Sequence, residues 1–420
     1  MIPLLVSLVV FLLLGVPVAY ALGLSACTYF VLVQPDLLVV LLQRLFSGMN
    51  AYALIALPLF ILMGQVMNAS GITDRLIRFC LALVGRLARG LGLVNVGASM
   101  LFGGISGSST SDTASIGSVL IPAMDRRGSP RALAAGVTVA SSTMGMIIPP
   151  SIPIVIYAVT AQESVGRLFL GGVVPGLLVG ILQVTLVHWT ARRHGYPREE
   201  ARFTPTDFLL EMLKSSYVLI MPVFVVGTVV FGVATATESA GLGVFYALCV
   251  GSLRGHEFYA ALRESILTSA KIMIIIATSQ IFIWVLALER VPDEVAQLVI
   301  DFDLPPVTML LAISIVILAA GTFIDVSPAI LLLIPVFLPV IHQAGISPVL
   351  FGVLLVAGLA VGACTPPVGN CLNVCSLVSG LQIGPIFRAA LPFLSANVVV
   401  LILIALFPDL ILWLPDLLMD

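Results

Sequence analysis

The most restrictive feature of this sequence is the length of its uncharged, apolar stretches. Residues 1–35 and 307–324 contain no charged side chain. An apolar stretch of about 18 residues or more is long enough to cross a bilayer as a helix, and at least eight can be counted. The chain has 21 acidic and 19 basic residues in 420 and a mean hydropathy of +1.17. A water-facing surface needs more charge, so the sequence predicts an all-α polytopic membrane protein.

The cysteines, the histidines and the N-terminal residues argue against a disulfide framework, a zinc site and a cleaved signal peptide. The six cysteines lie in apolar surroundings and form no C-x-x-C pair, and the four histidines are far apart in sequence. These spacings favour buried apolar thiols over a disulfide framework or a zinc site. Ala19-Tyr20-Ala21 is similar to a signal cleavage site, but no basic residue precedes it. We therefore expect the first helix to be retained.

An internal repeat is visible in the glycines and prolines. "MGMIIPPS" at 144–151 resembles "VGACTPPV" at 361–368, an offset of 366 − 149 = 217 residues. Glycine and proline restrict backbone shape, so matches in one register predict a duplicated backbone. We place the two halves at 1–215 and 216–420. The same offset pairs Gly104 with Gly321, Pro122 with Pro339, Gly128 with Gly345, Gly145 with Gly362, and Pro175 with Pro392.

Each half predicts the same order of elements after its scaffold helices. An amphipathic arm comes first (71–90 or 289–303), followed by two half-helices around a polar turn (92–127 or 307–342). A helix broken at Pro-Pro follows (131–160 or 348–380). Half-helices of about 10–15 residues are shorter than a hydrocarbon core of about 30 Å, so we predict two re-entrant hairpins.

Loop charges orient the predicted elements. Basic residues surround the first hairpin and acidic residues surround the second. By the positive-inside rule, the first hairpin enters from the cytoplasm and the second from the periplasm. The repeats are then inverted. Arg44 falls on the external side, and we place it on an interfacial helix over residues 37–48.

Four polar segments interrupt the apolar chain, and they carry the predicted site. They are the hairpin tips "GGISGSSTSD" and "GTFIDVSP" and the breaks "GMIIPPS" and "GACTPPVGN". Non-helical backbone at membrane depth is tolerated only inside protein or beside a water-filled cavity. In the second tip we expect Ser327 to cap a helix that starts at Pro328, which leaves 321–326 unwound.

Carbonyls, hydroxyls and a carboxylate at such breaks suit a hard cation such as Na⁺, and the helix N-termini suit an anionic substrate. We predict one cation site from Ser106, Ser108 and Ser109 with the carbonyl of Gly145. A second is predicted from Gly321, Thr322, Asp325, Gly362 and Thr365. The candidate substrate contacts are Thr110, Thr143, Ser151 and Asn370.

Two carboxylates keep alternative interpretations. Asp112 either caps the second half-helix of the first hairpin or has a functional role, and Glu238 stands where a helix begins. We expect Asp325→Asn to weaken sodium dependence more than Asp112→Asn. A channel with re-entrant loops is the alternative function. An intramembrane hydrolase is disfavoured because no general base lies beside the serines.

The motifs that carry these predictions resemble a known family. "GGISGSSTSDTASIGSVLIPAM", "GMIIPPSIPIVIYAV", "GTFIDVSPAILLLIPVFLPV" and "GACTPPVG" are similar to the large membrane subunit of TRAP (tripartite ATP-independent periplasmic) transporters. The likeness runs nearly end to end, although Ala236 stands where the family usually has proline.

The resemblance implies a partner set and a mechanism. The partners would be a small four-helix membrane subunit and a periplasmic substrate-binding protein. The activity would be sodium-driven import of a carboxylate solute, not an enzymatic reaction. The transporter would lie in the bacterial inner membrane and use an elevator-type motion of the hairpin-bearing domain.

Overall fold

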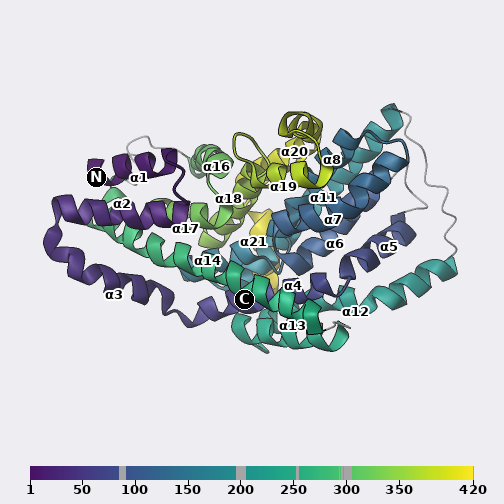
Figure 1. Ribbon diagram of the computed structural model, residues 1–420, viewed down its shortest axis with the longest axis horizontal. Helices are drawn as coiled ribbons and strands as arrows, with labels where there is room; N and C mark the ends of the chain where they lie inside the picture. The colour runs from purple at the N-terminus through teal and green to yellow at the C-terminus, as the bar shows by residue number, and fades with distance from the viewer. Residues whose placement is uncertain are drawn as a thin grey trace.

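The computed structural model describes residues 1–84, 91–194, 205–251, 255–292 and 305–419, with the single positions 294 and 297. Within these ranges the chain is helical and contains no strand. The molecule is elongated, with α1–α3 at one end and α5 and α12 toward the other (Figure 1). The first half contains α1 (Ile2–Leu13), α2 (Val18–Val33), α3 (Leu38–Met49), α4 (Ala56–Ala69), α5 (Ile72–Val84), α6 (Leu91–Ser106), α7 (Ser109–Arg126), α8 (Arg131–Ser142), α9 (Met144–Ile147), α10 (Ile152–Ala161) and α11 (Val165–Arg193).

The second half begins with two long helices and a short one. The helix α14 runs along much of the molecule and packs against α2, α3 and α4. The elements are α12 (Pro205–Val230), α13 (Ala236–Val250), α14 (Gly255–Leu288), α16 (Pro306–Phe323), α17 (Val326–Gln343), α18 (Pro348–Gly362), α19 (Asn370–Ser379), α20 (Ile383–Leu406) and α21 (Asp409–Met419).

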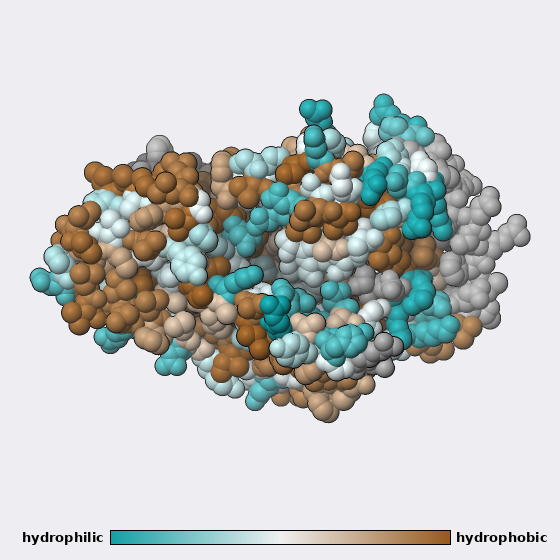
Figure 2. Space-filling model, viewed as in Figure 1, coloured by the Kyte–Doolittle hydropathy of each residue, from teal (hydrophilic) through white to brown (hydrophobic). Residues whose placement is uncertain are grey.

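Eight helical segments of the described chain are long and apolar enough to cross a membrane. Hydrophobic residues cover much of the end formed by α1, α2 and α3 (Figure 2). Exposed Val9, Leu13, Val39 and Phe46 belong to this surface. Eight candidate spans together with an apolar outer surface indicate that the chain is a multi-pass membrane protein.

The buried centre is built by the helices that carry the Pro-Pro motifs. Every residue of α18 from Val349 to Gly362 is buried, and α18 packs against α16 and α20. The helix α8 packs in turn against α20 and α7. Proline begins both α16 and α18 at a position where no backbone donor is needed.

Both predicted helix breaks are present. The helix over 131–160 is interrupted at 148–151, and the helix over 348–380 is interrupted at 363–369. Proline lacks an N–H and disfavours helical geometry in the preceding residue, so each Pro-Pro pair ends a helix. The Pro149–Pro150 and Pro366–Pro367 peptide bonds are both cis.

The hairpin helices are longer than the sequence predicts. They contain 16 residues in α6 and 18 in each of α7, α16 and α17. At 1.5 Å per residue these helices are about 24–27 Å long, and α16 and α17 count among the candidate spans. The prediction of 10–15 residues was wrong because the polar tip residues continue the helices.

The unwound tips are correspondingly short. Only Gly107 and Ser108 separate α6 from α7. In the second hairpin, α16 continues to Phe323 and α17 begins at Val326, with Asp325 at the N-cap position. The expected cap at Ser327 was wrong, since Ser327 and Pro328 lie inside α17.

The two predicted arms are only partly described. The first contains α5, and residues 85–90 lie outside the described ranges. Most of the second arm, 293 and 295–303 except 297, also lies outside them. The predicted helix over 37–48 is present as α3.

Candidate functional site

The first hairpin tip packs directly on the first Pro-Pro break. A Cβ added to Gly103 in α6 would lie 2.8 Å from the Cα of Gly145 in α9, so only glycine permits this approach. Gly107 has a φ of +62°, a conformation that glycine adopts readily. Its carbonyl accepts a hydrogen bond from the N–H of Ile152, just after the break, at 3.4 Å.

The second tip and the second break make a corresponding contact. A Cβ added to Gly362 at the end of α18 would lie 2.6 Å from the Cα of Gly321 in α16. The N–H of Val368 donates to the carbonyl of Thr322 at 3.1 Å. In each half, therefore, a glycine pair and one backbone hydrogen bond hold a tip to a break.

The serines of the first tip form a connected polar group. Ser106 Oγ donates to Asp112 Oδ1, and Ser108 N donates to Ser106 Oγ at 3.2 Å. The hydroxyls of Ser108 and Thr110 lie 3.1 Å apart. Ser106 and Asp112 are buried, so the structure brings two predicted cation ligands beside a carboxylate with an open role.

Asp112 is the residue whose importance the sequence left undecided. Its side chain is completely buried, and within the described chain its Oδ2 atom has no hydrogen-bond partner. The carboxylate lies against Gly145, where an added Cβ would collide with it. A buried carboxylate costs several kcal/mol unless a cation or proton neutralises it. The donor set around Gly145 therefore fits a hard cation.

Ser109 points toward the other half of the chain. Its hydroxyl lies 3.0 Å from the Sγ of Cys371 in α19, and both residues are buried. This contact is part of the packing between α7 and α19. Ser109 therefore connects the first hairpin to the second broken helix instead of turning toward Asp112.

The residues of the second predicted cation site are more exposed to solvent than those of the first. Asp325 is exposed, and Asn370 Nδ2 donates to its Oδ1 at 2.8 Å. Thr322 Oγ1 donates to the Ala319 carbonyl at 2.8 Å, and Thr365 Oγ1, in the break, donates to the Val361 carbonyl of α18 at 2.9 Å. The structure thus brings Asp325 into contact with a predicted substrate residue, Asn370, while the two threonine hydroxyls donate to carbonyls of α16 and α18.

Two other predicted substrate contacts have hydroxyls that are already used inside the protein. Thr143 is completely buried and accepts a hydrogen bond from Asn397 Nδ2 at 2.8 Å. Asn397 Oδ1 in turn accepts from Gln183 at 2.7 Å. Ser151 is buried, donates to the Met146 carbonyl and caps α10. The polar pair beside Thr143 is therefore Gln183 in α11 and Asn397 in α20. No local pattern in the sequence predicts this pair.

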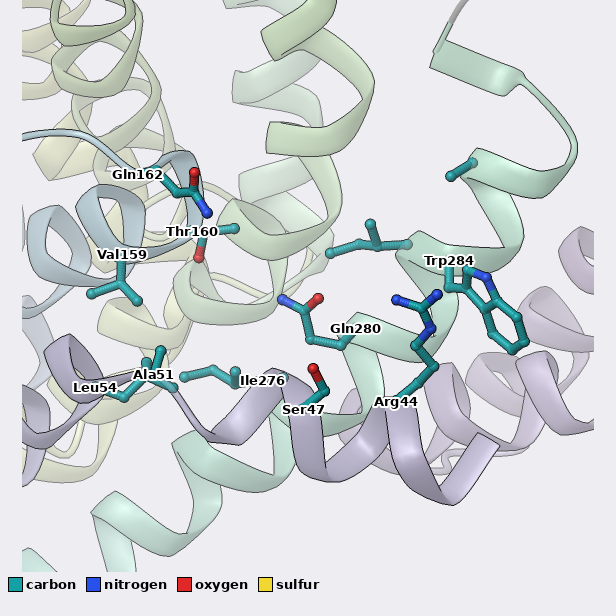
Figure 3. A pocket seen from close by; sticks show the side chains of 13 residues that line it. Arg44, Ser47, Ala51, Leu54, Val159, Thr160, Gln162, Ile276, Gln280 and Trp284 are labelled. Atoms are coloured by element: carbon teal, nitrogen blue, oxygen red, sulfur yellow. The ribbon is translucent and has the colours of Figure 1, made fainter. Parts of the chain in front are cut away.

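A cavity of about 400 Å³ lies apart from these tips, between α3, α14 and the end of α10 (Figure 3). Arg44, Ser47 and Gln280 are among its lining residues. The guanidinium of Arg44 lies over the Trp284 ring, 5.1 Å from its centroid. No motif in the sequence predicts a function for this region.

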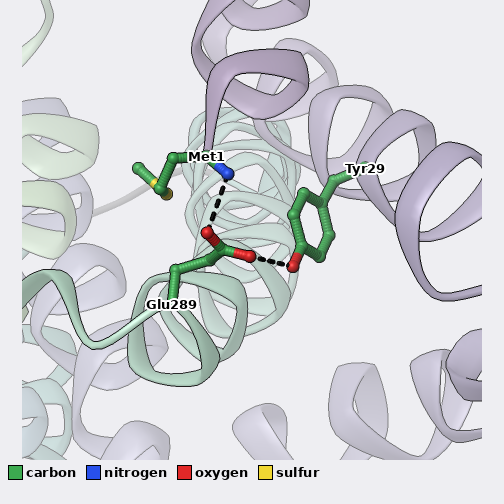
Figure 4. Close-up of polar contacts among 3 residues, drawn as sticks. All are labelled: Met1, Tyr29 and Glu289. Atoms are coloured by element: carbon green, nitrogen blue, oxygen red, sulfur yellow. Dashed lines mark hydrogen bonds and ion pairs between the residues drawn. The ribbon is translucent and has the colours of Figure 1, made fainter.

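Two carboxylates outside the candidate spans have structural partners. Glu289 accepts hydrogen bonds from the amino group of Met1, at 2.8 Å, and from the Tyr29 hydroxyl (Figure 4). The Met1 amino group and then Tyr29 lower the pKa of Glu289. Glu238 forms a capping box with Thr235, whose backbone N–H lowers the pKa of Glu238. Both carboxylates hold helix ends in place.

Comparisons with known proteins agree with the helical architecture. The family model described as "Tripartite ATP-independent periplasmic transporter, DctM component" matches residues 5–410. The chain is 38% identical over 401 residues to the C4-dicarboxylate TRAP transporter large permease protein DctM of Pseudomonas aeruginosa, covering 94% of each chain. It is 34% identical over 403 residues to the isethionate TRAP transporter permease protein DctMQ of Oleidesulfovibrio alaskensis, covering 95% of this chain and 64% of that protein.

A solved structure shares the fold at low sequence identity. The YdaH transporter of Alcanivorax borkumensis superposes with a TM-score of 0.63 at 13% identity, covering 90% of each chain. At this identity the likeness concerns the fold alone. The chain therefore shares the overall arrangement of its helices with that protein.

Proposed function

The chain belongs to the DctM component family of tripartite ATP-independent periplasmic transporters, and from this we propose sodium-coupled import of a carboxylate solute. A periplasmic binding protein would deliver the solute. The related permeases carry C4-dicarboxylate and isethionate in their names, and both are organic anions. Import of an acidic solute is consistent with those names.

The observation that carries the proposal is the pairing of each hairpin tip with a Pro-Pro break. In the first pairing the Asp112 carboxylate lies beside the Ser106 hydroxyl and Gly145. In the second the Asp325 carboxylate accepts a hydrogen bond from the Asn370 side-chain amide. Oxygen ligands of this kind suit a hard cation. One Na⁺ would be held by Ser106, Asp112 and the Gly145 region, and another by Asp325 with the carbonyls of the second tip.

The expected assembly contains further components. We propose a small four-helix membrane subunit as a partner and the bacterial inner membrane as the location. We also propose that the two helical hairpins are re-entrant and that their domain moves against α1–α4 and α12–α14 as an elevator. The close glycine contacts in both halves support this because they join each hairpin to its broken helix as one body.

Reconstituted uptake tests the proposal. The chain, its small subunit and its binding protein are placed in proteoliposomes, and uptake of labelled succinate is followed with and without an inward sodium gradient. We expect uptake to require both the gradient and the binding protein. Downhill flux that is indifferent to both would refute the proposal and favour the channel alternative.

Paired variants test the two cation positions. The unpartnered oxygen of Asp112 changes the expectation from sequence, and we now expect Asp112→Asn and Asp325→Asn each to weaken sodium dependence. Asp125→Asn is a matched control. This carboxylate at the end of α7 is exposed, and its ion pair with Arg131 is long, at 3.9 Å. Wild-type sodium dependence in both test variants would show that the cation sites are misplaced.

A further inference from the structure

The cavity between α3, α14 and α10 has one end that is suited to an anion. Among the residues that the structure describes, thirteen line it, and of these Arg44 alone is charged. Arg44 forms no ion pair with the described residues of the chain, and its side chain is exposed. A guanidinium without a carboxylate partner beside a cavity attracts oxyanions.

Neutral hydrogen-bonding groups stand beside this charge. Figure 3 shows Ser47 and Gln280 directed into the space next to Arg44. A Cβ on Gly48 would overlap the side chain of Gln280, so the close packing of α3 on α14 fixes the base of that side chain. The Ser47 hydroxyl and the Gln280 amide can both donate to an oxygen held by Arg44.

The opposite end of the cavity is less favourable to an anion. It is lined by Thr160 and Gln162 at the end of α10, where the last carbonyls of the helix carry partial negative charge. The charge distribution therefore places an anion at the Arg44 end. Trp284 supports this end because its ring packs under the guanidinium.

We propose that this cavity is an oxyanion-binding site formed by Arg44, Ser47 and Gln280. Its ligand is a carboxylate or phosphate group. The carboxylate of the transported solute and the phosphate of a lipid headgroup share this chemistry.

The position of the cavity favours the solute. The helix α10 begins at the first Pro-Pro break beside Gly107 and ends at the cavity. Ten residues at 1.5 Å per residue separate the two ends by about 15 Å. A solute bound at Arg44 would thus be separated from the hairpin tip by α10 and the length of the cavity. This assignment of the solute rests on the proposed function, whereas the oxyanion site itself does not.

Charge-selective modification of the Ser47→Cys variant tests the site without transport. The full chain is treated with an anionic (sulfonatoethyl) or a cationic (trimethylammonioethyl) methanethiosulfonate, and the unmutated chain provides the blank for the native cysteines. The ratio of the two rates is independent of the thiolate fraction of the introduced cysteine. A unit charge about 6 Å away in a water-like medium changes each rate about 3-fold.

We therefore expect Arg44→Gln to lower the anionic-to-cationic rate ratio about 10-fold, and Arg44→Lys to preserve most of it. Arg193→Gln is the matched control, because Arg193 also stacks on a tryptophan, 5.3 Å from the Trp189 ring, but lies on α11. A ratio that Arg44→Gln leaves unchanged, or that Arg193→Gln lowers equally, would overturn the proposal. Elution as a single species in size-exclusion chromatography verifies that each variant is folded.

Protection experiments on the Ser47→Cys variant then identify the source of the oxyanion. Succinate or inorganic phosphate added in maltoside detergent should slow modification of the introduced thiol, and Arg44→Gln should abolish this effect. Protection by phosphatidylglycerol but by neither free anion would support the oxyanion site and assign it to a lipid headgroup. If no anion protects the thiol, the proposal fails, whether or not the reconstituted transporter imports succinate.

Discussion

The substitution Gly362→Ala tests the contact between the second tip and the second break. The added Cβ would lie 2.6 Å from the Cα of Gly321, 2.7 Å from its carbonyl carbon and 3.0 Å from the Leu318 carbonyl oxygen. All three are backbone atoms, so no side chain can rotate away. Because carbon atoms pack at about 3.5–4.0 Å, α16 and α18 must separate by about 1 Å.

The free energy cost follows from that separation. Overpacking of a buried site costs about 1–3 kcal/mol, and a rigid backbone contact belongs at the upper end. The hydrogen bond from Val368 N to the Thr322 carbonyl is 3.1 Å long. A further separation of about 1 Å would break this bond, at a net cost of about 1 kcal/mol. We therefore expect Gly362→Ala to destabilise the protein by about 3–4 kcal/mol.

The assay is thermal aggregation in detergent followed by size-exclusion chromatography, together with uptake in proteoliposomes. Gly384→Ala is the control, because a Cβ at this helical position in α20 would meet nothing within 4 Å. We expect a clear loss of thermostability and of sodium-driven uptake for Gly362→Ala alone. Equal stability and uptake in the two variants would refute the close approach of Gly321 and Gly362.

Three further predictions concern single contacts. Gly145→Ala should displace the Asp112 carboxylate and weaken sodium dependence of uptake, which titration with Na⁺ would measure; an unchanged half-saturating concentration would contradict the assigned position. Thr235→Ala should cost about 1 kcal/mol by removing the cap of α13, seen as a lower melting midpoint than wild type. Because folding lowers the pKa of Glu289, its contacts stabilise above the usual value of 4.5 and are lost as pH falls below it. Wild type should therefore melt higher than Glu289→Gln at about pH 7, and a difference that persists undiminished at about pH 3 would contradict this.

The element order was largely predictable because proline and apolar length act locally. Pro-Pro at 149–150 and 366–367 removes two donors and ends a helix wherever it occurs, and both breaks are present. The boundaries of the hairpin tips were mispredicted because polar residues were interpreted as non-helical backbone. Ser109, Thr110 and Asp112 are polar, yet they continue α7, and inside the protein Ser109 contacts Cys371 while one Asp112 oxygen accepts from Ser106.

The ligands of the site were harder to predict than its position. The choice among Ser106, Ser108 and Ser109 depends on the direction of each side chain, and these residues lie at the end of α6, in the two-residue tip and at the start of α7. Ser109 turns to Cys371, which is 262 residues away in the chain. The Thr143 hydroxyl likewise accepts a hydrogen bond from Asn397, which is distant in the sequence. Such long-range partners leave no local pattern in a sequence.

The two halves share a backbone arrangement but differ in their chemistry. A tip glycine meets a break glycine in both, and each tip carbonyl accepts from a backbone N–H after the prolines. The carboxylates are nevertheless placed differently: Asp112 is buried in the first turn of α7, whereas Asp325 is exposed ahead of α17. An offset of 217 residues therefore locates both tips through glycine and proline, which define backbone shape. It does not locate the ligands, because the 217-residue counterpart of Asp112 is Ala329 and that of Asp325 is Ser108.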